Sequence, residues 1–284
     1  MTTDETARRG RTTEIEILAL EGSASTSKYD RVVTEEPLEL RLVAGAASAT
    51  LAVTMRTPGN DFELAAGFAF GESIVRGREE IAGIGYCLDP ALDREQRYNV
   101  VNVELARREL PDLVRLERHF AASSACGVCG RAQIQALHEL GIEPLTDDVR
   151  VSAGLLYSLP DRMRDAQRVF ASTGGLHAAA LFNGVGEPIV VREDVGRHNA
   201  VDKIVGWGLL DGRLPFAGTI LMISGRAGYE ILQKSAVARI PIVCSVSAPS
   251  SLAVELARRF DIALIGFVRD GRANVYSGRA RITG

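Results

Sequence analysis

Short apolar runs that alternate with helical patterns in the second half of the chain are the feature that most limits how it can fold. From about residue 152, the pattern predicts strands over 177–182, 188–191, 219–223, 242–246 and 262–267. Helical spacing separates them over 155–170, with an interruption at Pro160, and over 197–210, 229–239 and 251–260. Strands that are apolar at every position are typical of sheets covered by helices on both faces. We therefore expect a three-layer α/β/α domain with a mostly parallel sheet.

The first half has a different pattern. Short segments over 14–20, 31–33, 38–43 and 49–57, separated by Gly, Pro and Ser, predict an antiparallel meander, and 81–87 and 98–105 predict two more strands. A helix begins near Pro58-Gly59-Asn60, with Asp61 as the candidate N-cap. We expect a smaller, mainly β (α+β) domain over 14–118 after a disordered tail over 1–13. The α/β/α domain then spans 119–284 and includes a mobile loop over 121–130.

Composition limits the class of protein. A chain of 284 residues, 46% of them hydrophobic, can bury a full core without disulfides or metal. Its formal net charge of −3 argues against a general nucleic-acid binder. Because the chain shows neither an apolar signal core nor an apolar run of transmembrane length, we expect no membrane insertion. Four cysteines do not make a disulfide framework in a chain this long. We expect a cytoplasmic protein with reduced thiols.

One loop holds two of the four cysteines. Residues 123–130 read S-S-A-C-G-V-C-G and contain Cys126 and Cys129. Apolar residues at helical spacing follow over 131–140, so the thiols lie at or just before a helix N-terminus. The backbone N–H groups there, and Arg131 beside them, favour the thiolate form. The pattern indicates a nucleophilic or sulfur-carrying cysteine.

Two other interpretations of this C-x-x-C pair remain open. A structural zinc site needs about four ligands, and the sequence offers only the scattered His119, His138, Cys87 and Cys244. We therefore expect no structural metal, and we interpret Cys87, in an apolar strand, as a core thiol. A thiol–disulfide redox pair of the thioredoxin type follows the first strand of a small domain, whereas this pair lies in mid-chain.

Polar residues follow four of the predicted strands. The loops read R-E-D-V-G-R-H over 192–198, S-G-R-A-G over 224–228, S-V-S-A-P-S over 245–250 and V-R-D-G-R over 268–272. Ligands of such sheets bind beyond the carboxyl ends of the strands, and arginines and helix N-termini there bind phosphates. Each loop by itself fits ordinary helix caps and surface ion pairs better than a ligand site. Together they predict an anionic, nucleotide-like ligand; the residues assigned to it are Ser224, Gly225, Arg226, His198 and Asp194, with Asp194 or Glu193 accepting from a guanine edge.

Four motifs of the chain are long enough to compare with known families: the C-x-x-C loop, T-G-G-L-H-A-A-A-L over 173–181, R-E-D-V-G-R-H-N-A-V-D-K over 192–203 and S-G-R-A-G-Y-E-I-L-Q-K over 224–234. They closely resemble the FdhD family of sulfurtransferases required for formate dehydrogenase activity. The resemblance implies a cytidine-deaminase-like fold for the C-terminal domain and a homodimer. It implies that Cys126 carries sulfur as a persulfide received from a cysteine desulfurase, with Cys129 as its partner. The sulfur passes to the molybdenum bis-guanine-dinucleotide cofactor, of which GDP is a partial mimic, for use by apo-formate dehydrogenase.

The resemblance also assigns a cofactor-binding segment near the C-terminus. It falls on Phe267, Val268, Arg269, Asp270, Gly271 and Arg272. Zinc deaminase chemistry is not expected, because no Glu stands two residues after His177 and no cysteines begin the helix at 251. A non-catalytic cofactor chaperone is the main alternative function, and a thiol–disulfide oxidoreductase is another.

Overall fold

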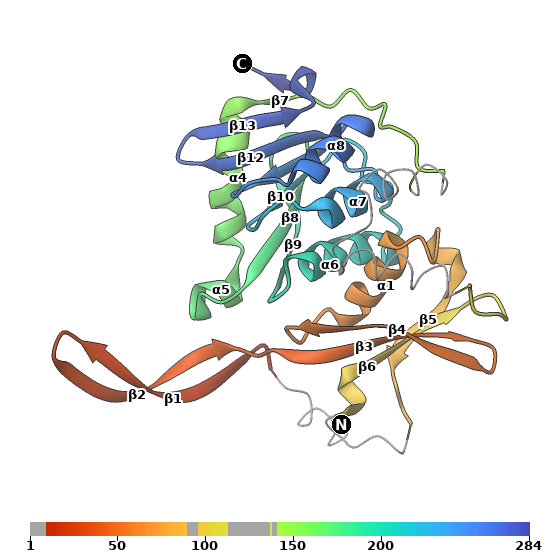
Figure 1. The fold of residues 1–284 in the computed structure, drawn as a ribbon, viewed down its shortest axis with the longest axis horizontal. Coiled ribbons are helices and arrows are strands. Elements are labelled where there is room, and N and C mark those ends of the chain that lie inside the picture. Colours follow the sequence, from red (N-terminus) through yellow and green to blue (C-terminus); the bar gives the residue numbers. More distant parts are fainter. Residues whose placement is uncertain (1–9, 90–95, 113–136, 138–140) are drawn as a thin grey trace.

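Two sheets lie on opposite sides of a helical layer in the structure, a computed structural model that describes residues 10–89, 96–112, 137 and 141–284 (Figure 1). The larger sheet contains six strands, in the order β13-β12-β11-β10-β8-β9. Their bounds are β8 His177–Phe182, β9 Pro188–Asp194, β10 Ile220–Ile223, β11 Ile242–Ser245, β12 Ala263–Arg269 and β13 Arg272–Ser277. The smaller sheet has the order β4-β3-β6-β5, with β3 Glu36–Ala44, β4 Ala47–Arg56, β5 Ile81–Tyr86 and β6 Val100–Leu105.

Helices cover both faces of the six-stranded sheet. One face packs on α4 (Ala153–Asp165) through a cluster that includes Leu156, Met222 and Cys244. The other packs on α6 (Arg197–Leu210), α7 (Tyr229–Val237) and α8 (Ser251–Arg259). The three-layer α/β/α arrangement is therefore confirmed. No helix among the described residues is long and apolar enough to cross a membrane.

The expectation of a mostly parallel sheet is wrong. Only β10–β11 and β11–β12 pair parallel, whereas β10–β8, β8–β9 and β12–β13 pair antiparallel. Short connections account for the β8–β9 and β12–β13 pairs, because a tight turn can join only antiparallel neighbours. Asp270 and Gly271, with φ of 51° and 69°, form the two-residue turn between β12 and β13. The loop expected over 268–272 is therefore a hairpin turn, and β13 is an additional strand that the apolar pattern does not predict.

Pro160 does not interrupt its helix. It lies inside α4, and the chain leaves the helix at Ala166 before a short α5 (Arg168–Thr173). The buried face of Leu156, Leu159 and Met163 stabilises α4 against the sheet, and such packing outweighs a missing hydrogen bond. Short remaining elements are β7 (Val151–Ser152), β14 (Ile282–Thr283) and 3₁₀ turns at Arg78–Glu80, Gln96–Asn99 and Arg279–Arg281.

The N-terminal strands do not form one meander. β1 (Thr12–Glu21) and β2 (Ala24–Val33) make a separate two-stranded hairpin that projects from the body (Figure 1). β3 and β6 pair parallel, with the other pairs of the four-stranded sheet antiparallel. Residues 12 and 13 belong to β1, so the ordered chain begins before the expected start at Glu14. The polar residues of β2 gave no apolar signal over most of its length.

Asp61 is not the N-cap of α1 (Asp61–Gly71). Asn60 holds that position with φ of 59°, and the buried Asp61 is the first helical residue. Its carboxylate accepts hydrogen bonds from Arg56 at 3.1 Å and from the Tyr86 hydroxyl at 3.0 Å. The ion pair joins α1 to the end of β4, which explains why this carboxylate is buried.

Close packing of α1 on α6 joins the two predicted domains through one continuous apolar core. The helices meet at Gly67 and Gly206, where an added Cβ would lie within 2 Å of a backbone carbonyl oxygen of the other helix. Arg192 on β9 adds a bidentate ion pair to Glu63 on α1, at 2.6 and 2.7 Å. The first half of the chain is thus fixed directly against the layer that supports the larger sheet.

Candidate functional site

A pocket of about 770 Å³ opens at one edge of the six-stranded sheet. The carboxyl ends of β9, β10, β11 and β12 meet at this edge, together with the start of β8, because β8 runs antiparallel to its neighbours. Strand ends supply Val195, Ser224, Val246 and the β12–β13 turn to the lining. The polar loops predicted to converge at this edge therefore do so.

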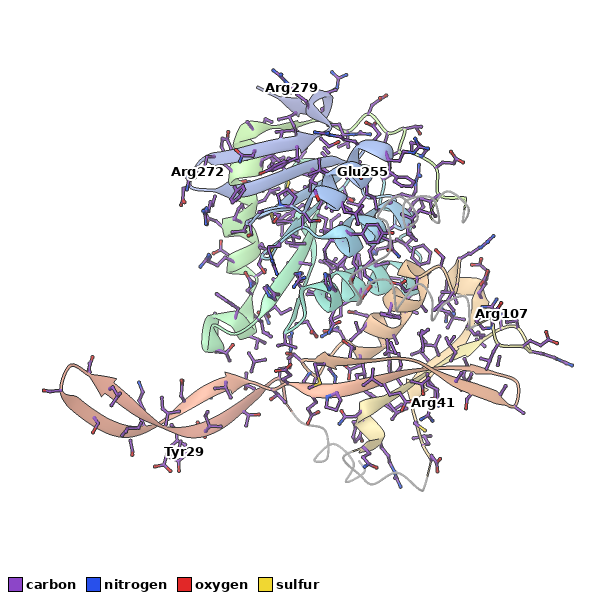
Figure 2. All side chains as sticks on the ribbon, viewed as in Figure 1. Tyr29, Arg41, Arg107, Glu255, Arg272 and Arg279 are labelled. Atoms are coloured by element: carbon purple, nitrogen blue, oxygen red, sulfur yellow. The ribbon has the colours of Figure 1, made fainter. Side chains whose placement is uncertain are left out.

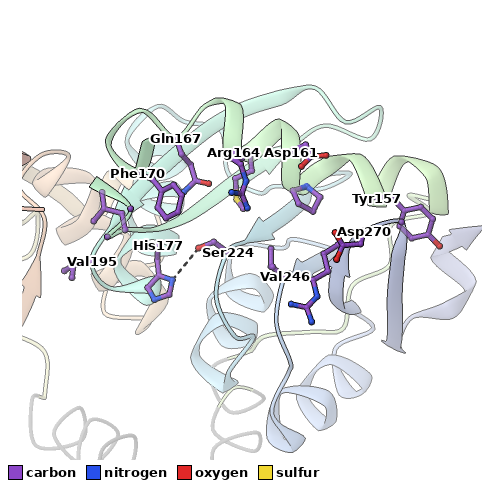
Figure 3. A pocket seen from close by; sticks show the side chains of 17 residues that line it. Tyr157, Asp161, Arg164, Gln167, Phe170, His177, Val195, Ser224, Val246 and Asp270 are labelled. Atoms are coloured by element: carbon purple, nitrogen blue, oxygen red, sulfur yellow. Dashed lines mark hydrogen bonds between the residues drawn. The ribbon is translucent and has the colours of Figure 1, made fainter. Parts of the chain in front are cut away.

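The opposite wall comes from α4, α5 and the segment before β8. Figure 3 shows their side chains facing the strand ends across the pocket. The lining residues on this wall are Tyr157, Pro160, Asp161, Met163, Arg164, Gln167, Phe170, Gly174, Gly175 and Leu176. None of them is among the ligand residues predicted from the sequence, although Gly174, Gly175 and Leu176 belong to the motif over 173–181.

Charges of both signs line the pocket. Arg164 from α4 and Arg269 from the end of β12 supply guanidinium groups, and Asp161 and Asp270 supply carboxylates. Guanidinium groups bind phosphates with charge-assisted hydrogen bonds, and carboxylates accept from amide and amino N–H groups. The pocket therefore suits a ligand with an anionic part and a part that donates hydrogen bonds.

His177 lies at the start of β8, where the two walls meet. Its Nδ1 is 3.4 Å from the Ser224 hydroxyl (Figure 3). This hydroxyl accepts a hydrogen bond from the Ala178 N–H at 2.9 Å. Burial, and then the nearby Arg197 guanidinium, lower the pKa of His177. The imidazole is therefore neutral at pH 7 and can donate or accept a hydrogen bond.

Asp194 does not face the pocket, which corrects its assignment as a ligand residue. It is 0% exposed, and its carboxylate receives four donors: Lys203 Nζ at 2.6 Å, Asn199 Nδ2 at 2.9 Å, Gly196 N at 2.8 Å and Thr57 N at 3.2 Å. A carboxylate with four donors has no capacity left for a guanine edge. Asp194 instead fixes the loop after β9 against the chain after β4.

The Glu193 carboxylate also forms hydrogen bonds within the protein. Its two carboxylate oxygens accept from Phe170 N at 2.7 Å and Val169 N at 3.1 Å. These bonds hold the first turn of α5, and with it Phe170, at the pocket. Glu193 therefore positions the part of the pocket wall that α5 forms, and its carboxylate is not available to accept hydrogen bonds from a guanine.

The other predicted ligand residues divide into two groups. Ser224, Arg269, Asp270 and Gly271 line the pocket. The remaining ones do not: Gly225, Arg226, His198, Phe267, Val268 and Arg272. Val268 is in the core cluster beneath α4, while Arg226 and Arg272 point to solvent.

His198, at the start of α6, faces α7 and not the pocket. Its Nδ1 lies 3.3 Å from Glu230 Oε2. Burial first, and then the positive charges of Arg197 and Lys234, lower the pKa of His198 to about 4. The imidazole is therefore neutral at pH 7, so this is a polar contact between the two helices and not an ion pair.

Comparison with known proteins identifies the family. The sequence model of the FdhD/NarQ family matches residues 33–283. The chain belongs to this family. It is 48% identical over 277 residues to a sulfur carrier protein FdhD of Streptomyces avermitilis, covering 96% of both chains. It is 44% identical over 261 residues to one of Mycobacterium tuberculosis, covering 90% of this chain and 93% of the relative.

The fold has a counterpart among solved structures. A formate dehydrogenase accessory protein from Desulfotalea psychrophila superposes with a TM-score of 0.71 over 96% of this chain and 99% of that chain. At 24% identity this similarity shows the fold alone. It confirms the mixed α/β architecture expected from the pattern of strands and helices in the sequence.

Two of the four cysteines of this family member lie in the described part of the chain, and both are buried. Cys87 is 5% exposed and Cys244 is 0% exposed. Burial raises the pKa of the Cys244 thiol. Cys126 and Cys129, like the rest of the predicted 121–130 loop, lie outside the described residues.

Proposed function

We propose that this FdhD family member is a sulfur carrier that accepts sulfur from a cysteine desulfurase as a persulfide on Cys126. The observation that carries the proposal is the burial of Cys87 and Cys244, in a chain whose relatives are named sulfur carriers. A buried thiol cannot meet the persulfide of another protein, and only the thiolate is a nucleophile. Cys126 and Cys129 are the remaining cysteines of the sequence.

The transfer is a thiolate–disulfide exchange. The Cys126 thiolate attacks the terminal sulfur of the donor's persulfide, a new S–S bond forms, and the donor cysteine leaves as its thiolate. No net oxidation takes place, because one S–S bond replaces another. Cys129 can then release the carried sulfur as hydrosulfide by closing a disulfide with Cys126, and a dithiol reductant must restore the pair.

The pocket is proposed to hold the acceptor of that sulfur, the molybdenum bis-guanine-dinucleotide cofactor destined for apo-formate dehydrogenase. Its volume of about 770 Å³ is in the range of nucleotide-sized ligands, so it fits one nucleotide half. Arg164 and Arg269 are placed to bind phosphate. Asp161 and Asp270 replace Asp194 and Glu193 as the carboxylates that accept from the guanine edge, because they line the pocket.

Mass mapping of sulfane sulfur tests the carrier function. The full chain is incubated with a cysteine desulfurase and cysteine, and the peptides are separated without a reductant. We expect one added sulfur on the peptide with Cys126 and none after Cys126→Ala. Sulfur found on Cys87 or Cys244, with none on Cys126 or Cys129, refutes the proposal.

The same variant separates a carrier from a chaperone. A carrier with Cys126→Ala still binds GDP but fails to activate formate dehydrogenase, whereas a non-catalytic cofactor chaperone retains both properties. GDP binding thus serves as the folding control for the loss of activation.

A further inference from the structure

Arg197, the first residue of α6, is a charged side chain to which the proposed function gives no role. It is half-buried, its Nε is shielded from solvent, and its guanidinium forms neither a hydrogen bond nor an ion pair within the described part of the chain. Water hydrates arginines at the outside of the molecule, such as Arg272 and Arg279 in Figure 2. Arg56 and Arg192, which are also shielded, each pair with a carboxylate. Because buried donors are nearly always paired, Arg197 has the properties of an anion-binding residue.

The Arg197 side chain packs on the loop that follows β10, together with His177. A Cβ added at Gly225 would lie 3.3 Å from Arg197 Cδ and 3.3 Å from both Cε1 and Nδ1 of His177. Glycine at this position therefore lets both side chains lie against the loop. His177 in turn contacts the Ser224 hydroxyl at 3.4 Å, and both of these residues line the pocket. Arg197 thus lies beside the part of the pocket that His177 and Ser224 form.

This part of the pocket is separate from the turn that supplies Arg269 and Asp270. Figure 3 shows His177 at one end of the pocket and Asp270 and Tyr157 at the other. In the sheet, β10 and β11 separate β8 from β12. If Arg269 and Asp270 hold the nucleotide half, as proposed above, the part of the pocket beside Arg197 remains for a second group.

The charges around Arg197 suit a small anion with a single negative charge. The Asp194 carboxylate also acts on His177, but it is 0% exposed and already accepts from Lys203 Nζ at 2.6 Å. Burial first, and then the charge of Arg197, lower the pKa of His177, so the imidazole can supply an N–H donor without adding a charge. One positive charge in a half-buried place compensates one negative charge, whereas a second negative charge would be desolvated without a partner.

Hydrosulfide is a small anion of this kind, and the proposed function produces it when Cys129 closes a disulfide with Cys126. We propose that Arg197 binds this hydrosulfide at the β8 end of the pocket, with His177 and Ser224 completing the site. No covalent bond forms there and the guanidinium keeps its proton, so charge-assisted hydrogen bonds hold the sulfur next to its acceptor. The inference rests on the proposed function, because only a sulfur carrier has hydrosulfide to hold.

Titration of the full chain with sodium hydrosulfide tests the inference. It is followed by proton NMR in the absence of oxygen at pH 8, where hydrosulfide is the main form of sulfide and His177 is neutral. The chain has four histidines, and the variant His177→Gln identifies the Cε1–H signal of His177. This signal should shift as hydrosulfide binds, and the shift gives a dissociation constant. Arg197→Gln should raise that constant about ten- to a hundredfold, the range expected for a hydrogen bond to a charged group.

Arg226→Gln is the matched control, since it removes the same charge from the neighbouring loop at an exposed position. It should bind hydrosulfide like the wild type. Arg197→Lys keeps the positive charge and should bind hydrosulfide more tightly than Arg197→Gln. Without any hydrosulfide, Arg197→Gln should also raise the pKa of His177, because a nearby positive charge is removed. GDP binding serves as the folding control for each variant.

Three results would overturn the inference: an unchanged His177 signal in the wild type, equal dissociation constants in the wild type and Arg197→Gln, or a response to sodium chloride as strong as that to hydrosulfide. GDP that blocks hydrosulfide binding would overturn it as well, since Arg197 would then hold a phosphate. Failure of the proposed function gives a different result, in which hydrosulfide binds but mass mapping finds no sulfur on Cys126. In that case the anion site stands and the carrier function is refuted.

Discussion

Replacing Gly67 by alanine is expected to force α1 and α6 apart. A Cβ at this position would lie 1.9 Å from the Asp202 carbonyl oxygen and 2.7 Å from the Gly206 nitrogen. Both atoms belong to the α6 backbone, so no rotamer change can relieve the overlap. The helices must separate by about 1.5 Å to restore ordinary contact. Gly206→Ala creates the mirror problem, with its Cβ 1.8 Å from the Glu63 carbonyl oxygen.

The magnitude follows from two opposing effects. Overpacking a tight core costs typically about 1–3 kcal/mol, and a backbone-to-backbone clash belongs at the upper end or above it. Alanine recovers up to about 1 kcal/mol, because glycine is a poor helix former. We expect a net loss of roughly 2 kcal/mol or more in the free energy of unfolding. The same separation of the helices relieves the overlap in either variant. The double variant should therefore lose less free energy of unfolding than the sum of the losses in the two single variants.

Urea unfolding of the full chain measures the effect, and Gly154→Ala is the matched control. Gly154 lies in the first turn of α4, where an added Cβ meets nothing within 4 Å. That variant should be neutral or stabilised by up to about 1 kcal/mol. If Gly67→Ala unfolds at the same urea concentration as Gly154→Ala, the close contact of α1 and α6 is refuted.

Three further outcomes are expected. In calorimetric titration, Arg269→Ala is expected to weaken GDP binding about ten- to a hundredfold, since a hydrogen bond to a charged group contributes roughly 1.5–3 kcal/mol. Arg272→Ala should leave the GDP affinity unchanged. Equal losses of affinity in the two variants would exclude GDP binding in the pocket. Asp161→Asn weakens GDP more than ADP, because only guanine presents N–H donors at N1 and N2; equal losses would show that this carboxylate does not read the base. The free energy of unfolding should fall as the pH drops from about 6.5 to about 4, because unfolding frees His198 to bind a proton. His198→Gln should make this fall smaller. If the pH profile of the variant is the same as that of the wild type, another titrating group causes the fall.

The apolar runs of the sequence predicted much of the larger sheet. β10, β11 and β12 lie within one or two residues of their expected positions, as do α6, α7 and α8. A strand buried on both faces must be apolar at every position, and this local requirement is visible in the sequence. The motifs over 173–181, 192–203 and 224–234 likewise led to the correct family.

Strand direction was not visible in the same way. β8 runs antiparallel to β10, yet its sequence is as apolar as that of a parallel strand. The signal that could have found β13 is Asp270-Gly271, which is the strongest short-range hairpin signature when apolar residues flank it. Here the charged residues Arg269 and Arg272 flank it, so the segment does not match the apolar hairpin pattern.

The sequence by itself determined the three-layer class, the polar edge of the sheet and the C-x-x-C pair as the candidate for sulfur chemistry. Only the tertiary structure decided which polar residues can meet a ligand. Asp161 and Arg164 have the pattern of a solvent-facing helix surface, and they reach the pocket because α4 crosses the sheet beside its carboxyl edge. Asp194 has the pattern of a ligand residue, and it is buried because Lys203 and the chain after β4 surround it. A side chain's chemistry is local, but its access to a ligand depends on neighbours far away in the sequence.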